Sequence, residues 1–158
     1  MLRRNMIALI VAVIAALAVT GGLLVWDNHR DAAVAAARRD APPEAGRVVA
    51  EMLSYSADTI DRDLAAVDGL TGSFQDEYRR LVTETIAPVA KEKGVSTKAR
   101  IVSAGVLSAA RDRVTLLMFI DQITVSTTVP APTTSSSRVS VTAELHDGRW
   151  LVSGMTPL

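Results

Sequence analysis

Hydrophobic positions along the chain change spacing twice, from a continuous apolar run to helical intervals and then to the alternation of strands. The continuous run is Met6–Trp26, in which 18 of 21 residues are apolar and none is charged. At about 1.5 Å per residue, a helix of this length covers roughly 30 Å, the thickness of a bilayer's hydrocarbon core. A helix also pairs its own backbone groups, which lipid requires. The run therefore predicts a transmembrane helix over residues 6–26, after a short cytoplasmic lead of residues 1–5.

A cleaved signal peptide is the alternative for this run, with Ala16-Leu17-Ala18 as the cleavage site. The apolar core of a signal peptide is only about 7–15 residues long, whereas this run continues to Trp26. Basic residues on the two sides of the span are nearly equal in number, so charge alone does not orient it. A long domain translocates largely regardless of its charge. We expect a single-pass protein of the plasma (inner) membrane, with a cytoplasmic N-terminus and an extracytoplasmic C-terminal domain.

Residues 27–43 are rich in alanine, the best helix former, and are expected to extend the span outward as a helical stalk. Pro42-Pro43 should end that stalk, because proline lacks the backbone N–H and disfavours helix at the residue before it. The remaining residues, 44–158, are long enough to form one domain with a real core.

Helical spacing returns after the two prolines. Three apolar stripes are expected on three helices: Val48, Met52 and Tyr55; Ile60, Leu64 and Val67; Phe74, Tyr78, Leu81, Val82, Thr85, Ile86 and Val89. Asp58 can cap the second helix, and Ser73 with Asp76 resembles a capping box for the third. Pro88 should kink or break the third helix before Gly94 ends it.

The period changes to that of strands from Thr97 onward. Four strands are expected, at Lys98–Ser108, Val114–Val125, Arg138–His146 and Arg149–Gly154. Asp147-Gly148 is a strong two-residue hairpin signal, and Ser126–Ser137 reads as a polar loop. Three helices followed by an antiparallel meander predict an α+β domain, in which the helices cover one face of the sheet. A curved sheet with helices across its concave face would be an NTF2-like cone.

Composition narrows the function classes. From residue 44 onward the chain has 12 basic and 14 acidic residues without a block of either sign, which argues against nucleic-acid binding. The absence of cysteine excludes disulfides, thiolate metal sites and thiol nucleophiles. Neither histidine, His29 or His146, is placed for proton transfer. Asp121, inside an apolar strand, either faces a cavity or points outward and pairs with an arginine. We expect a protein that is not an enzyme and has no metal or cofactor.

A series of short motifs resembles the Mce-associated membrane proteins (Mam) of actinobacteria in order and spacing. In chain order the motifs are Leu53-Ser54-Tyr55, Thr59–Leu64, Leu70–Phe74 with Glu77-Tyr78, Leu81–Pro88, Ala104–Val106 and Asp147–Val152. The resemblance implies a non-catalytic accessory or scaffold subunit of a mammalian-cell-entry (Mce) complex that imports lipids, either fatty acids or sterols. It implies a permease and Mce proteins as partners, beside the lipid bilayer. The resemblance supplies no catalytic residues.

Two other functions stay open from the residues alone. One is a membrane-tethered scaffold of another envelope machine, such as a component of type IV secretion. The other is a tethered enzyme or a carrier of a small apolar ligand, with direct lipid contact in a cavity lined by Tyr78, Met118, Phe119 and Trp150. Apolar residues on a sheet are, however, usually plain core.

Small residues recur at four-residue intervals within the predicted span, at Ala8, Ala12, Ala16 and Thr20. Such residues let two helices approach closely in lipid, although alanine is abundant throughout this chain. We predict that Ala12→Leu combined with Ala16→Leu leaves membrane insertion intact and abolishes co-purification with partner proteins. Unchanged co-purification of the double variant would exclude this face as a packing surface.

Overall fold

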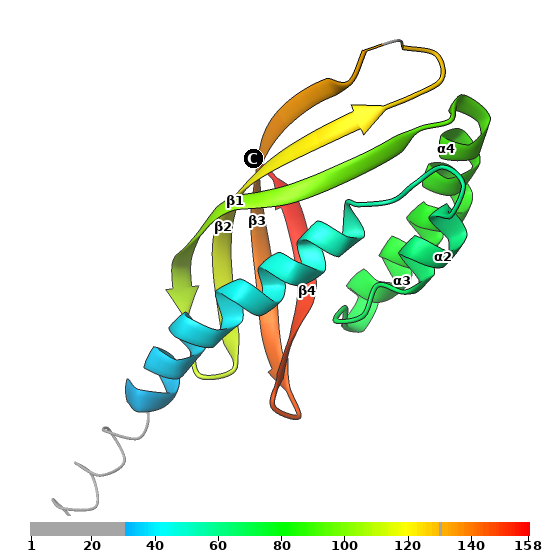
Figure 1. The fold of residues 1–158 in the computed structure, drawn as a ribbon. Helices are drawn as coiled ribbons and strands as arrows, with labels where there is room; N and C mark the ends of the chain where they lie inside the picture. Colours follow the sequence, from blue (N-terminus) through cyan, green and yellow to red (C-terminus); the bar gives the residue numbers. More distant parts are fainter. Residues whose placement is uncertain (1–30, 130) are drawn as a thin grey trace, which may run out of the picture.

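The computed structural model describes residues 31–129 and 131–158 (Figure 1). A long helix covers residues 31–52 and is followed by α2 (Ile60–Ala65), α3 (Gly72–Leu81), the π-helical turn η1 (Val82–Ile86) and α4 (Ala87–Lys93). Four strands complete the chain: β1 (Ser96–Ala109), β2 (Arg113–Val125), β3 (Thr133–His146) and β4 (Arg149–Pro157). The α+β class with a four-stranded antiparallel sheet is confirmed.

The predicted transmembrane helix, residues 6–26, lies outside the described residues. Among the helices that are described, none has both the length and the hydropathy of a membrane span.

The sheet is a meander in the order β1-β2-β3-β4, with every neighbouring pair antiparallel. Its last hairpin turns at Asp147 and Gly148, whose φ angles are 48° and 80°. Positive φ at both central residues is what the expected two-residue turn requires. The polar loop after β2 is shorter than predicted, because Thr133–Ser137 belong to β3 and pair with residues 120–124 of β2. Threonine favours strands. The strand continues here because β2 pairs with these residues, which the local sequence pattern does not indicate.

The core lies on one face of the sheet, called here the inner face. Alternate residues of β2 form its centre, at Val114, Leu116, Met118 and Ile120, each at most 1% exposed. Figure 1 shows the long helix crossing the sheet, and its residues Val48, Val49 and Met52 are buried in the same cluster. The helices therefore cover the inner face, and the opposite face is called the outer face.

The long helix continues through Pro42-Pro43, so the predicted stop at these prolines is wrong. The two residues cannot donate to the carbonyls of Arg38 and Arg39, but both arginines are exposed and water can hydrate those carbonyls. Three buried alanines belong to the core cluster on either side of the prolines: Ala37, Ala41 and Ala45. Packing of this small-residue stripe stabilises the helix across the position where we expected the stalk to end.

The shorter helices begin within two residues of the predicted starts, but without the predicted caps. The N-cap residues are Thr59 for α2 and Thr71 for α3, and neither side chain makes a capping hydrogen bond. Pro88 disturbs the third helix as expected: the preceding turn, η1, is π-helical, and α4 resumes with the proline in its first turn. A π-turn removes the need for an N–H that proline lacks. Gly94 ends α4 in the left-handed region, at φ 60°.

Connecting segments attach the helical layer to the two edge strands of the sheet, β1 and β4. On one side, Tyr55 and Thr97 of β1 exchange two backbone hydrogen bonds of 2.9 Å, and the N–H of Ala99 donates to Ser54 Oγ at 3.0 Å. Tyr55 therefore lies in a bridge rather than in the predicted helical stripe. On the other side, Val152 of β4 donates to the carbonyl of Gly69 at 2.7 Å and accepts from Thr71 at 3.0 Å. These contacts pair edge groups that would otherwise be free.

We predict that Leu116→Ala lowers the free energy of unfolding by about 2–5 kcal/mol, because removing this fully buried side chain leaves a cavity in the core. Val102→Ala on the outer face, where the side chain is 52% exposed, should change it by no more than about 0.5 kcal/mol. Urea unfolding of the full chain in mild detergent measures both. Equal losses in the two variants would contradict the assignment of the two faces.

Candidate functional site

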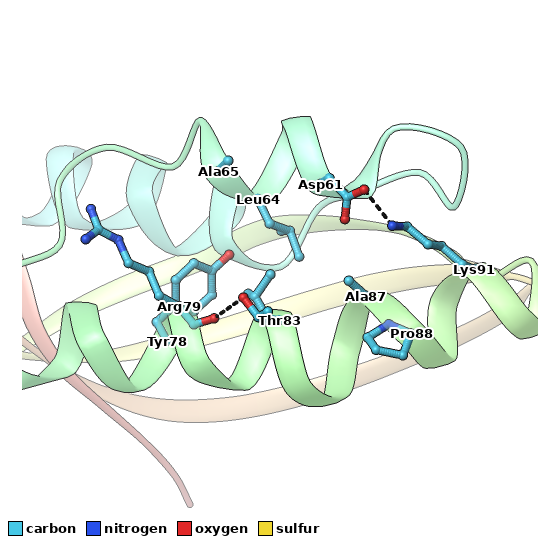
Figure 2. A pocket seen from close by; sticks show the side chains of 10 residues that line it. Asp61, Leu64, Ala65, Tyr78, Arg79, Thr83, Ala87, Pro88 and Lys91 are labelled. Carbon is cyan, nitrogen blue, oxygen red and sulfur yellow. Dashed lines mark hydrogen bonds and ion pairs between the residues drawn. The ribbon is translucent and has the colours of Figure 1, made fainter.

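The helical layer contains a groove between α2 and the continuous run of α3, η1 and α4 (Figure 2). The groove has a volume of about 540 Å³, and Leu64, Tyr78 and Ala87 form its apolar floor. Polar side chains stand at its rim, where Lys91 Nζ lies 2.5 Å from Asp61 Oδ2 and links α4 to α2. The floor residues are only 4%, 7% and 6% exposed, so most of this apolar surface already serves the core.

Tyr78 connects the groove to the long helix. Its hydroxyl donates to the carbonyl of Met52 at 3.2 Å. Burial raises the pKa of the Tyr78 phenol well above its ordinary value, so the hydroxyl stays protonated at physiological pH. Tyr78 therefore holds α3 against the long helix.

Asp63 organises the connection between the long helix and α2. Its Oδ2 accepts from the hydroxyl of Thr59 at 2.5 Å and from the backbone N–H of Ser56 at 3.2 Å. The Thr59 hydrogen bond is the main reason why the pKa of Asp63 lies below its ordinary value. The next residue, Ala57, donates its backbone N–H to Ser96 Oγ at a distance of 2.9 Å, and Ser96 is the first residue of β1. This network fixes the segment that pairs with the edge of β1.

The outer face of the sheet is not covered by any described element and carries large apolar side chains. Phe119 is 41% exposed at its centre, beside Val102 at 52% and the chain's last residue, Leu158, at 66%. These residues line a shallow hollow of about 680 Å³ together with Arg138 and Pro157.

Polar side chains border this hollow. Asp121 lies on the same face, 3.2 Å from the guanidinium of Arg100, and accepts from Ser136 Oγ at 2.7 Å. Asp121 is thus the outward-pointing, arginine-paired carboxylate of the two alternatives that the sequence allowed. Asp121 is itself one of the residues that line the hollow.

The residues predicted to line one cavity lie in different places. Tyr78 is in the floor of the groove, and Trp150 is buried on β4. Met118 is fully buried on the inner face, whereas Phe119 is on the outer face, because successive residues of a strand point to opposite sides. The structure does not bring the four side chains together. The predicted packing face, Ala8, Ala12, Ala16 and Thr20, lies outside the described residues.

Two features of the site were not identified from the sequence. Val102 joins the outer face through a register shift in β1 between Ile101 and Ser103, which strict alternation does not predict. Leu158 reaches the same hollow because its N–H donates to the carbonyl of Arg138 at 3.0 Å. The sequence did contain one signal for an exposed apolar face, which is that β2 has apolar residues on both of its faces.

Groups that commonly perform acid–base or metal chemistry are dispersed. His146 is exposed on β3, with Nε2 3.3 Å from Glu144 Oε2, and Glu144 also pairs with Arg113. Residues 31–129 and 131–158 contain no group of three or more histidine or acidic side chains able to hold a metal ion. The features that the described residues do present are a groove in the helical layer and an uncovered face of the sheet.

Solved structures define the class of fold. The chain is similar to an IcmL-like type IV secretion system protein from Legionella pneumophila, with a TM-score of 0.59, 9% identity and coverage of 74% of this chain and 90% of that one. It is also similar to CagV, a VirB8 homolog of the type IV secretion system from Helicobacter pylori, with a TM-score of 0.54, 17% identity and coverage of 72% and 92%. These likenesses support the expected NTF2-like fold.

Sequence comparison gives the family. No protein-family model matches the chain. It is 39% identical over 148 residues to the outer membrane protein Rv1973 of Mycobacterium tuberculosis, covering 90% of this chain and 91% of that protein. The chain therefore belongs to the family of Rv1973.

We predict that Asp63→Asn weakens the dependence of stability on acid pH. Because the pKa of Asp63 is lowered on folding, its carboxylate stabilises the fold above the ordinary value of 3.8, and this contribution is lost as pH falls through the lowered pKa. Thr59→Val, which removes the main donor to the carboxylate, should act in the same direction. Thermal unfolding between pH 7 and pH 3 tests both variants, and a wild-type loss of stability in both would contradict the assignment.

Proposed function

We propose that the protein is a non-catalytic accessory subunit of an Mce-type lipid import complex in the cell envelope. Residues 6–26 would anchor it in the plasma membrane and hold residues 44–158 outside. Three findings support the proposal: motifs that resemble the Mce-associated family, a relative named an outer membrane protein, and a fold similar to type IV secretion components. The observation that carries a scaffold role is the uncovered outer face around Phe119.

The outer face exposes more large apolar side chains than a surface in contact only with water requires. Phe119, Ile123 and Val125 of β2 are each more than 40% exposed, and Val102 of β1 is more than 50% exposed. A contiguous apolar patch rimmed by polar groups is typical of a protein-binding surface. An aromatic side chain in a hollow, with Arg138 beside it, also has the composition of an interface hot spot.

A scaffold of another envelope machine is the second candidate, favoured by the fold likeness to type IV secretion proteins. A carrier of small apolar ligands has less support. The groove's floor is already at least nine-tenths buried, so a ligand there would gain little apolar burial.

Affinity purification of the tagged full chain from membranes of its native host separates the first two candidates. We expect a permease and Mce proteins to co-purify with it. Recovery of secretion-system subunits instead, or of no membrane partner after mild cross-linking, would overturn the proposal.

We predict that Phe119→Glu reduces the co-purified partner at least roughly tenfold, because a hot-spot aromatic is replaced by a charge that the interface must desolvate. Leu81→Glu is the matched control, since Leu81 is 50% exposed on the helical side. It should retain its partners. Quantitative mass spectrometry of the eluates compares the variants, and equal recovery from both would remove the outer face from the proposal.

A further inference from the structure

The β2–β3 hairpin extends beyond the end of β4, as Figure 1 shows. Its connecting segment, Ser126–Ser137, has eight serines or threonines, two prolines and no charged residue among 12 positions. We call this segment the Ser/Thr arm. Serine- and threonine-rich segments with proline are typical of O-glycosylated regions in exported proteins.

The described residues of the arm after Ser126 are open to solvent. All of Thr133–Ser137 are exposed, although a strand packed on a core would bury every second residue. The pairing of β3 with β4 ends at Val139 and Pro157, so the preceding residues of β3 also form an edge of the sheet. Thr133 and Thr134 lie in the last pairs of the β2–β3 ladder, next to the turn.

Hydrogen bonding divides the hydroxyl groups of the arm into two sets. Ser126 and Thr128 pair with each other, Thr127 donates to the carbonyl of Lys93, and Ser136 donates to Asp121. Within the described part of the chain, no side-chain hydrogen bond engages the hydroxyls of Thr133, Thr134, Ser135 and Ser137. These hydroxyls are free to react.

The arm also lacks the usual protection of a sheet edge. Natural edges are commonly blunted by charges, bulges or a covering element, and β3 has no charged residue before Arg138 and no register shift against β2. Ile123, Val125 and Val129 beside it are 51%, 44% and 50% exposed. A bare, uncharged edge beside exposed apolar side chains is prone to pair with other chains. A covalently attached polar group would cover it.

We propose that the Ser/Thr arm is O-glycosylated, with Thr133 and Thr134 as the principal acceptors. This inference rests on the extracytoplasmic placement in the proposed function. The donor is a sugar linked through phosphate to a polyprenyl lipid, used by a membrane glycosyltransferase. The threonine oxygen forms a bond to the anomeric carbon while the bond from that carbon to the phosphate oxygen breaks. The lipid phosphate leaves with the electron pair, and the hydroxyl proton passes to a base of the transferase.

Intact-mass and peptide mass spectrometry of the full chain, purified from membranes of its native host, test the inference. We expect added masses equal to whole numbers of anhydrohexose units, located on the peptide that contains Thr133 and Thr134. Thr133→Val with Thr134→Val should remove most of the added mass, because valine keeps the shape and strand preference and lacks the hydroxyl. Thr142→Val is the matched control, because Thr142 is on the same strand but in the part that pairs with β4. This variant should keep the added mass.

A tag at the C-terminus, probed with protease on intact spheroplasts, separates the two failures. An accessible tag on a chain of unmodified mass would overturn the glycosylation and leave the proposed function standing. A protected tag would overturn the extracytoplasmic placement, and with it both proposals. A phosphate-sized increment, or sugar on residues outside the arm, would also overturn the assignment.

Discussion

The structure depends on the attachment of one helical layer to a sheet that is apolar on both faces. The inner residues of β2 are fully buried only because the long helix and α2–α4 lie over them. Backbone hydrogen bonds at Thr97 and Val152 hold that layer at opposite edges of the sheet. They supply hydrogen bonds to edge groups and also fix which face is covered. The outer face is consequently left open as a matter of topology.

These attachments give a physical meaning to the motifs on which the family resemblance rests. Ser54 and Tyr55 contact β1, Asp63 holds the turn that brings them there, and Thr71 contacts β4. Tyr78 then ties α3 to the end of the long helix. The order and spacing of the motifs therefore report how the helices are attached to the sheet. The proposed binding surface around Phe119 lies elsewhere.

The strands and the last hairpin were predictable because their signals are local: period-two alternation and an Asp-Gly turn. The long helix across Pro42-Pro43 was not, because burial of Ala37 and Ala41 against the sheet outweighs a local breaker. The prediction that four residues line one cavity was wrong for a related reason. Met118 and Phe119 both look like core residues, and only the covering layer decides which of the two is buried. Residue 102 joins the outer face through a register shift that leaves no mark in the sequence.

Length explains why the Ser/Thr arm is not covered by the rest of the structure. A 14-residue strand such as β1 or β3 spans roughly 46 Å, whereas the ten residues of α3 cover about 15 Å. The strands therefore extend past the elements that pack on them, and β4, with nine residues, stops short of the end of β3. What remains uncovered at that end is the uncharged edge at the Ser/Thr arm. The outer face near Phe119 is open for a different reason, because the helices lie on the other side of the sheet.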